Sequence, residues 1–340
     1  MKVRAETKHL SHDEWLEARS KGIGGSDAGT ILGVNPYKGR LELWLEKTGR
    51  KGDSFTGNEA TRLGQAFERP IAEVYAQSIA SQGLAVVSWP VILEGAYTWQ
   101  LANVDFFICR VTESNPDSLE LGKVNDWDHK IPPLNIERIL EVKTTGLSGR
   151  GNSRAWENGQ VPSGYYAQGC HYASITGIRD VTFVCLIGGQ GIVTRDVTYI
   201  EAEIDALVAA EVEFWHQIHS DIEPQATEND LDALKTLYPE STDEVVEADE
   251  IVLGLYKEYK AKKAVADETD EELKRLRAQI EQVIGSAQAV AYEGEILYTY
   301  KSNKASETFD SKAFKEAHPD LAAQFTKTKA GARVLRLVAE

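Results

Sequence analysis

Strand-like segments lie between helix-like segments over the first 220 residues, and this order limits the possible folds more than any other feature. Helical spacing of apolar residues comes first, at 41–45 and 63–75, and recurs at 163–176 and 203–218. Apolar runs typical of strands lie in between, at 84–87, 99–102, 106–109, 136–143, 181–187 and 192–198. Because a sheet must bury its apolar faces against other elements, this order predicts a central mixed sheet flanked by helices, an α/β or α+β fold.

The last third of the chain has a different pattern. Residues 221–250 carry a net charge of −10 and read as an acidic linker. Residues 251–284 have apolar side chains three and four apart, which predicts one long helix. A hairpin at 289–300, a short helix near 311–317 and a strand at 333–338 follow. We therefore expect one domain at 1–220 and a C-terminal α+β accessory module at 251–340, whose role the residues do not indicate.

Composition excludes several classes of protein. The 340 residues contain no apolar run long enough to span a membrane, and the first fifteen lack the apolar segment of a signal peptide. The three cysteines, Cys109, Cys170 and Cys185, lack CxxC spacing and fit free thiols in a reducing cytoplasm. The net charge of −16 weakens non-specific nucleic-acid binding, but much of it lies in 221–250, so it does not forbid a local basic groove.

The candidate chemistry lies on two predicted strands. Glu141 and Lys143 are two residues apart, so their side chains point to the same face, while Val142 points into the core. Asp105 precedes the strand at 106–109, and if the two strands pair, Asp105, Glu141 and Lys143 converge at one sheet edge. Two carboxylates suit Mg²⁺ or Mn²⁺, and a lysine beside them suits phosphodiester hydrolysis. The bland alternative is a surface ion pair between Glu141 and Lys143.

A glycine-rich turn supplies a second candidate site. Gly22–Gly25 is preceded by Arg19 and followed by a predicted helix start at Ser26, which would let main-chain N–H groups face an anion. Arg150 and Arg154 follow the Lys143 strand in a loop rich in glycine and serine, where they contact phosphates or simply face water. By contrast, Tyr165 and Tyr166 are expected to pack in the core or between helices and not to stack on bases. His171 is expected to be a structural residue and not a general base.

Five segments occur in a characteristic order. They read RSKGIGGSDA continuing to GVNPY at 19–37, LGQAFERPIA at 63–72, ANVD at 102–105, LEVKTT at 140–145, and VPSGYYAQ followed by HY and TG at 161–177. In this the sequence resembles the YqaJ/lambda-exonuclease family of phage recombination nucleases, within the PD-(D/E)xK superfamily, and the resemblance implies a restriction-endonuclease-like core. One departure is Val104, where the family usually has proline.

The resemblance also implies a role for each matching residue. Asp105, Glu141 and the Val142 carbonyl would bind Mg²⁺, with Mn²⁺ able to replace it. Glu68 would support the metal or its water, Lys143 would position the nucleophile, and Gln168 is a motif glutamine near the site. Arg19 and Ser26 match residues that hold the 5′-phosphate of a DNA end.

The activity implied by the resemblance is Mg²⁺-dependent 5′→3′ digestion of one strand from duplex DNA ends, leaving 3′ overhangs for recombination by single-strand annealing. A ring-shaped homotrimer, an annealing partner of the RecT/Red-beta type, and a bacterial cytoplasm during phage or prophage recombination are also implied. Two alternatives remain: a restriction-like endonuclease and a catalytically silent DNA-end-binding protein. Arg19 and Ser26 argue against the first, and the complete set of Glu68, Asp105, Glu141 and Lys143 argues against the second.

Overall fold

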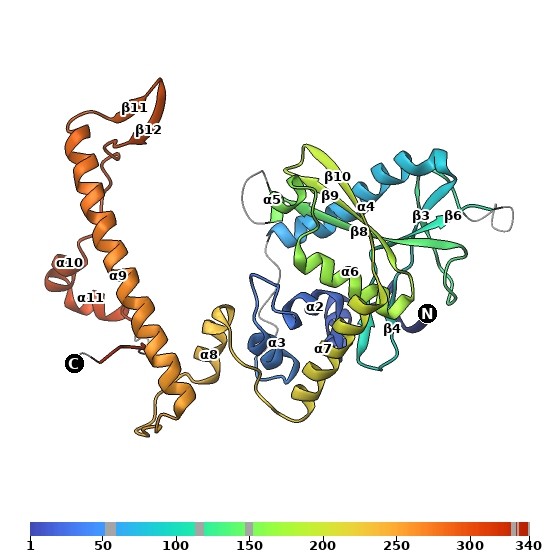
Figure 1. Ribbon diagram of the computed structural model, residues 1–340, viewed down its shortest axis with the longest axis horizontal. Coiled ribbons are helices and arrows are strands. Elements are labelled where there is room, and N and C mark those ends of the chain that lie inside the picture. Colours follow the sequence, from blue (N-terminus) through green and yellow to red (C-terminus); the bar gives the residue numbers. More distant parts are fainter. Residues whose placement is uncertain (52–58, 113–118, 147–151, 328–330, 332, 339–340) are drawn as a thin grey trace. The chain divides into compact units, whose positions relative to one another are not determined.

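The computed structural model describes residues 1–51, 59–112, 119–146, 152–327, 331 and 333–338 (Figure 1). The chain divides into two compact units, unit 1 at Met1–Tyr238 and unit 2 at Pro239–Glu340. Unit 1 holds every predicted site residue that the structure describes. It extends beyond the expected boundary at residue 220, for a reason given below.

A six-stranded mixed sheet forms the centre of unit 1. Its strand order is β10–β9–β8–β6–β3–β7, with β8–β9 and β3–β7 parallel and the other pairs antiparallel. This confirms the predicted mixed α/β class. The strands span Leu84–Ser88 (β3), Phe106–Arg110 (β6), Val124–Asp126 (β7), Ile136–Thr145 (β8), Asp180–Ile187 (β9) and Gly191–Thr198 (β10).

A smaller sheet of four strands lies in the same unit, in the order β1–β4–β5–β2. In it β2 runs parallel to β5 with Ile23 opposite Gln100, so the glycine-rich turn is held beside the segment that leads to Asp105. The strands span Lys2–Glu6 (β1), Ile23–Gly24 (β2), Val91–Glu94 (β4) and Gln100–Ala102 (β5).

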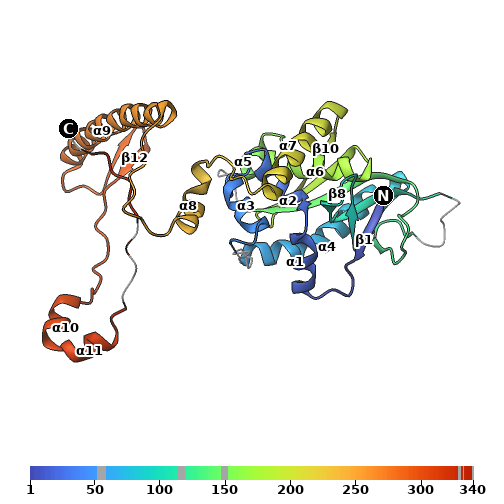
Figure 2. The same ribbon diagram turned by 90° about the horizontal axis from the view of Figure 1, so that it is seen from below.

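Helices cover both faces of the six-stranded sheet. Figure 2 shows α4 (Glu59–Ile79) on one side of β8, and α6 (Ser163–Thr176) with α7 (Glu201–His219) on the other. Successive residues of a strand face opposite sides, so Val142 packs with the α4 cluster while Ile139 joins the α6 cluster. Pro70, expected to kink or end this helix, lies inside α4, where the neighbouring Ile71 and Ala72 are buried in the core.

The N-terminal segment and the remaining short elements complete unit 1. The predicted capping box is present at α1, because the Ser11 side chain accepts from the Glu14 main chain and the Glu14 carboxylate accepts from the Ser11 N–H. These elements span His12–Ser20 (α1), Gly25–Ile31 (α2), Arg40–Lys47 (α3), Ala80–Gln82 (η1) and Asn152–Glu157 (α5).

Part of the expected acidic linker belongs to unit 1. Residues Glu228–Asp230 (η2) and Leu231–Leu237 (α8) are helical, and Asp230 is fully buried. The Asp230 carboxylate accepts from the Glu42 main chain at 2.9 Å, which caps α3 in place of a side chain on Gly39. Asp230 was expected to lie in an acidic linker, whereas its carboxylate caps the start of α3.

Unit 2 contains a 35-residue helix, α9 (Glu250–Ile284), and the hairpin β11 (Ala289–Tyr292) and β12 (Glu295–Thr299). Two short helices follow, α10 (Ser311–Ala317) and α11 (Pro319–Gln324), of which only α10 was expected. Residues 333–338 are not a strand, contrary to the prediction. Their alternating apolar pattern permits a strand, but a strand also needs a partner edge, and pattern alone does not supply one.

A buried ion pair joins α6, α7 and β5 in unit 1. His171 and Glu211 are fully buried, with His171 Nδ1 2.6 Å from Glu211 Oε1 and His171 Nε2 3.0 Å from the Leu101 carbonyl oxygen. Both ring nitrogens thus face acceptors. Burial alone would lower the pKa of His171, but the Glu211 carboxylate outweighs it and raises that pKa. His171 is therefore a structural residue, as expected.

The pair predicts a stability that declines with rising pH. Below the unfolded pKa of about 6.5 the imidazolium contributes fully, and the contribution is lost as pH rises through the raised folded pKa. In urea titrations, Glu211→Gln should cost about 3–5 kcal/mol of unfolding free energy at pH 6 and clearly less at pH 9. An equal difference between wild type and variant at both pH values would contradict this assignment.

Candidate active site

Strand pairing brings the predicted carboxylates together. Strands β6 and β8 are antiparallel neighbours with Phe106 opposite Leu140, and Asp105 immediately precedes β6. Asp105 Oδ2 accepts a hydrogen bond from the Val142 main-chain N–H at 3.0 Å. This bond holds the Asp105 carboxylate against β8, at the residue that lies between Glu141 and Lys143 in the sequence.

Glu141 and Lys143 point to the same face of β8, as their spacing predicts. Lys143 Nζ lies 2.7 Å from Glu141 Oε2 and 3.9 Å from Asp105 Oδ2. Glu141 is fully buried, and its other oxygen, Oε1, is buried with no hydrogen-bond partner in the described part of the chain. The surface ion pair considered as an alternative is therefore wrong, because neither charge lies on an open surface.

The site has an excess of negative groups. Burial raises the pKa of Glu141, and the Asp105 charge raises it further. The same two causes, in the same order, raise the pKa of Glu68, which lies on α4. Burial would lower the pKa of Lys143, but Glu141 and Asp105 raise it, so the lysine stays charged. The ammonium group of Lys143 thus lies near the carboxyl groups of Glu68, Asp105 and Glu141 in a largely buried site.

Gln168 reaches the site through a tyrosine. Gln168 Nε2 donates to the Tyr172 hydroxyl at 3.0 Å, and that hydroxyl donates to the Asn103 carbonyl oxygen at 2.9 Å, two residues before Asp105. Burial, then the charges of Glu141 and Asp105, raise the pKa of Tyr172. Tyr172 was not singled out from the sequence. The signal was its position four residues after Gln168 on one predicted helix, where side chains share a face.

The two other aromatic residues of this segment pack as expected, and one of them borders the site. The Tyr166 ring meets the Tyr199 ring edge-on at 4.9 Å, and its hydroxyl donates to Glu203. The Tyr165 ring lies beneath Lys143, with Nζ 5.2 Å from its centroid. Tyr165 therefore forms part of the wall around the lysine.

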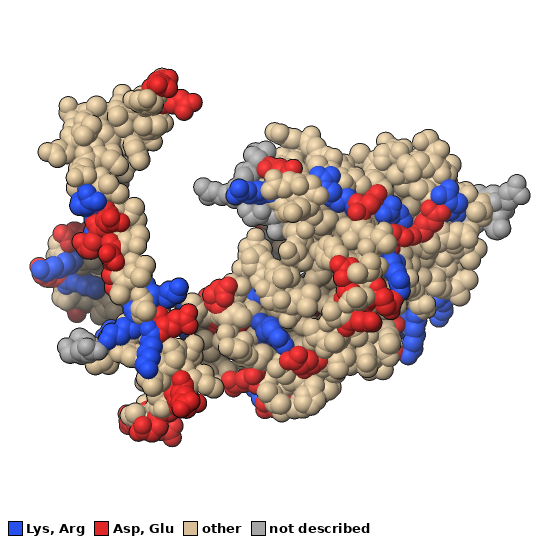
Figure 3. Space-filling model, in the orientation of Figure 1, with Lys and Arg blue, Asp and Glu red and all other residues tan. Residues whose placement is uncertain are grey.

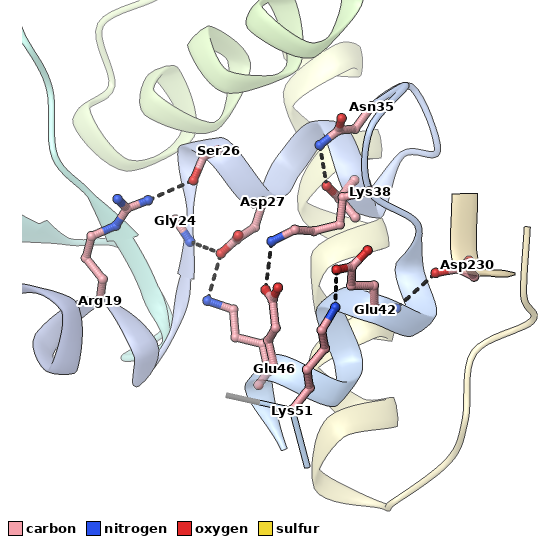
Figure 4. A network of polar contacts seen from close by, with 12 residues as sticks. Arg19, Gly24, Ser26, Asp27, Asn35, Lys38, Glu42, Glu46, Lys51 and Asp230 are labelled. Carbon is pink, nitrogen blue, oxygen red and sulfur yellow. Dashed lines mark hydrogen bonds and ion pairs between the residues drawn. The ribbon is translucent and has the colours of Figure 1, made fainter. Parts of the chain in front are cut away.

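Arg19 and Ser26 meet, as the second candidate site requires. An Arg19 guanidinium nitrogen donates to Ser26 Oγ at 2.7 Å, and the guanidinium lies over the Trp15 ring at 4.5 Å. Figure 4 shows Asp27 directed back to the turn, where its carboxylate accepts from the Gly24 N–H at 3.0 Å. That N–H is thus occupied and does not face an anion as expected. A phosphate here would be bound by the side chains of Arg19 and Ser26.

Asp27 fixes the position of this turn. Lys47 Nζ lies 2.8 Å from its carboxylate. Burial would raise the pKa of Asp27, but Lys47 outweighs burial and lowers the pKa to about 2. The carboxylate is therefore charged at neutral pH and holds the turn and α3 together.

A glycine links the two candidate sites. A Cβ on Gly25 would lie 2.6 Å from Tyr172 Cε1 and 3.0 Å from Gln168 Cγ, so only glycine lets α2 rest on this part of α6. Ser26 is the next residue. Tyr172 and Gln168 consequently border both the Arg19–Ser26 pair and the carboxylate site.

The arginines after β8 stay predictions. Arg150 lies outside the described residues, and Arg154 is exposed on α5, whose Trp156 is fully buried. On the face of the molecule in Figure 3, basic and acidic side chains are interspersed over unit 1. None of the helices in the described ranges is both long and apolar enough to cross a membrane.

Comparison with known families agrees with the ordered segments. Residues 14–179 match the family described as the YqaJ-like viral recombinase domain. This match covers Arg19, Ser26, Glu68, Asp105, Glu141, Lys143 and Gln168, so the family resemblance seen in the sequence is confirmed over those residues.

One relative and two solved structures illustrate the breadth of the similarity. The uncharacterized protein YqaJ of Bacillus subtilis strain 168 is 33% identical over 216 residues, which are 63% of this chain and 58% of that protein. An alkaline exonuclease (LHK-Exo) from Laribacter hongkongensis is 16% identical, over 62% of this chain and 94% of that one, with a TM-score of 0.44. A phage related exonuclease from Haemophilus somnus 129PT is 15% identical, over 59% and 96%, with a TM-score of 0.36.

The close packing of α2 on Tyr172 and Gln168 predicts a steric effect at Gly25. Gly25→Val should place a methyl group inside the Tyr172 ring and lower the free energy of unfolding by about 1–3 kcal/mol, measured by urea titration. Gly164→Ala is the matched control, because a Cβ there meets nothing within 4 Å. Equal stability of Gly25→Val and wild type would show that α2 does not rest on α6 in this way.

Proposed function

We propose that this protein is a metal-dependent exonuclease that hydrolyses phosphodiester bonds at the ends of duplex DNA. The observation that carries the proposal is the buried Oε1 of Glu141, which lies beside Asp105 and Lys143 and has no hydrogen-bond partner among the described residues. A buried acceptor without a donor is costly, and a cation is the partner that suits a carboxylate surrounded by further carboxyl groups.

The side chains present fit Mg²⁺ or Mn²⁺. Asp105, Glu141 and the Val142 carbonyl would hold the ion, with Glu68 acting on it through water. Mg²⁺ is commonly bound by one or two carboxylates and several waters. Among the described residues, no three His, Cys, Asp or Glu side chains gather as a complete metal site, so water would have to supply the remaining ligands. A bound ion would supply an acidified water and neutralise charge on the phosphate.

The chain's own groups would orient the substrate. Lys143 stays charged and has three donors, of which one points to Glu141, so the others are available to hold the attacking water in position. Gln168 and Tyr172 would keep Asp105 in place through Asn103. Arg19 and Ser26 would hold a terminal 5′-phosphate, and this contact would set the 5′→3′ direction of digestion.

The setting proposed for this activity is phage or prophage recombination in a bacterial cytoplasm. The 3′ overhangs would be passed to a single-strand annealing protein of the RecT/Red-beta type, and the enzyme would act as a ring-shaped homotrimer. These parts of the proposal rest on the family resemblance. Closed circular plasmid distinguishes the main alternative, since an exonuclease leaves it intact while a restriction-like endonuclease cuts it.

Glu141→Gln should abolish digestion of linear duplex DNA. The change keeps the shape of the side chain but removes the charge that would bind the metal, a loss of at least about a thousandfold in rate. Glu137→Gln is the control, because Glu137 lies on the same strand but pairs with Arg110 at the surface. Substantial activity in Glu141→Gln would place the reaction elsewhere.

Chelation gives an independent check on the metal. EDTA should stop the reaction, Mg²⁺ or Mn²⁺ should restore it, and Ca²⁺ should not, because Ca²⁺ takes a larger and looser ligand shell. The measurement is the release of acid-soluble nucleotides from linear duplex. Full activity after exhaustive chelation would remove metal chemistry from the proposal.

Arg19→Ala should slow digestion of 5′-phosphorylated ends about ten- to a hundredfold more than that of 5′-hydroxyl ends. The reason is loss of a charge-assisted hydrogen bond that only the phosphorylated end offers. Lys21→Ala is the control, because Lys21 is a nearby exposed cation paired with Glu17. If Arg19→Ala changes the rates on both kinds of end by the same factor, Arg19 does not read the phosphate.

A further inference from the structure

The long helix of unit 2 carries an apolar seam with a strict seven-residue repeat. Two series of positions run along α9, each with a spacing of seven. The first is Val252, Tyr259, Ala266, Leu273 and Ile280, and the second is Leu255, Lys262, Thr269, Leu276 and Val283. With the first series at position a of a heptad, the second falls at position d, which is the pattern of a coiled coil. The large apolar residues of this pattern lie at 252–259 and at 273–283, and Lys262, Ala266 and Thr269 separate them.

The seam is open to solvent in the single chain. Six of its seven large apolar residues, at 252, 255, 259, 273, 276 and 283, are each 44–78% exposed, and Ile280 is partly buried. A helix of 35 residues with such a stripe gains its stability by burying the stripe against another element. Near the end of α9, the hydroxyl of Tyr300, the residue after β12, donates to Glu281.

The charges beside the seam indicate what covers it. In a parallel, in-register pair of such helices, each g position faces the e position five residues further along the partner. Glu258 at g would then face a partner lysine equivalent to Lys263, and Glu272 at g would face the equivalent of Arg277. Each attractive contact occurs twice in a two-fold pair, and the surface is complementary to itself.

We propose that α9 pairs with α9 of a second copy of this chain as a parallel, in-register coiled coil. Lys262 and Thr269 interrupt the apolar d series near its middle, and polar residues inside a seam select one register at some cost in stability. The exposed intrahelical pairs Lys263–Asp267 and Arg277–Glu281 contribute little and can be exchanged for contacts between the two helices.

DNA is a poorer occupant for this face. Residues 250–284 contain seven basic and eight acidic side chains, so α9 lacks the basic stripe of a nucleic-acid-binding helix. The proposal concerns α9 alone and does not depend on the nuclease activity. It is separate from the ring-shaped homotrimer proposed above, because a two-fold pair of α9 helices would join copies of this chain that belong to different trimers.

Cysteine cross-linking of the full chain tests the register directly. In the proposed pair, position 276 faces position 276 of the partner, so Leu276→Cys should give a covalent dimer, twice 37.6 kDa, on a non-reducing gel after mild oxidation. Ala278→Cys, on the outward side of α9, is the control and should stay monomeric on the gel. The native Cys109, Cys170 and Cys185 are buried and add little background. Equal cross-linking at 276 and 278, or none at 276, would overturn the proposal.

Light scattering of seam variants tests the energetics. Leu273→Ser combined with Leu276→Ser should raise the dissociation constant at least about a hundredfold, since two buried leucines are lost. Leu253→Ser is the control, because Leu253 is also exposed but lies off the seam. Any association through unit 1 would be the same in the double variant and in the Leu253→Ser control. An unchanged dissociation constant in the double variant would overturn the proposal.

A charge exchange tests the parallel orientation. Glu272→Arg should weaken association, and adding Arg277→Glu to the same chain should restore it, because the two new charges again face each other across the pair. A dissociation constant that neither change alters would exclude the parallel, in-register arrangement.

Discussion

One side-chain hydrogen bond fixes the geometry of the carboxylate site. The Val142 N–H donates to Asp105 Oδ2, and this single contact fixes a carboxylate at the start of β6 against the strand that carries Glu141 and Lys143. Val142 itself faces the opposite side, where it packs in the core under α4. The strand is therefore held by apolar burial on one face while its polar groups are placed on the other.

The charge balance of this site explains why it is suited to chemistry. Glu141 is buried among other carboxyl groups with one oxygen lacking a donor, while Lys143 is its only described ammonium partner. Such an arrangement is costly for stability alone, because a buried charge needs full pairing. A bound cation would offset this excess of carboxyl groups in the proposed metal site. Tyr172 and Gln168 also border the Arg19–Ser26 pair, so end binding and hydrolysis would occur at neighbouring sites.

Much of this could be predicted from sequence, because it depends on local periodicity. The two-residue spacing of Glu141 and Lys143 fixed their shared face, and the apolar pattern predicted α6 with the observed bounds, Ser163–Thr176. The misses involve contacts between distant segments. Asp230 caps a helix that begins 190 residues earlier, and Tyr172 matters because it bridges Gln168 and Asn103. Residues 333–338 have a strand pattern without a partner, which periodicity alone does not reveal.

The most direct test of the account is whether the site binds a divalent cation in the absence of DNA. Titration of Mn²⁺ into the full chain, followed by electron paramagnetic resonance of the free ion, gives the number of ions bound. The account predicts binding to wild type and to Glu137→Gln, and its loss in Glu141→Gln. Equal binding of Mn²⁺ by wild type and Glu141→Gln would contradict the claim that the buried carboxylates form a metal site.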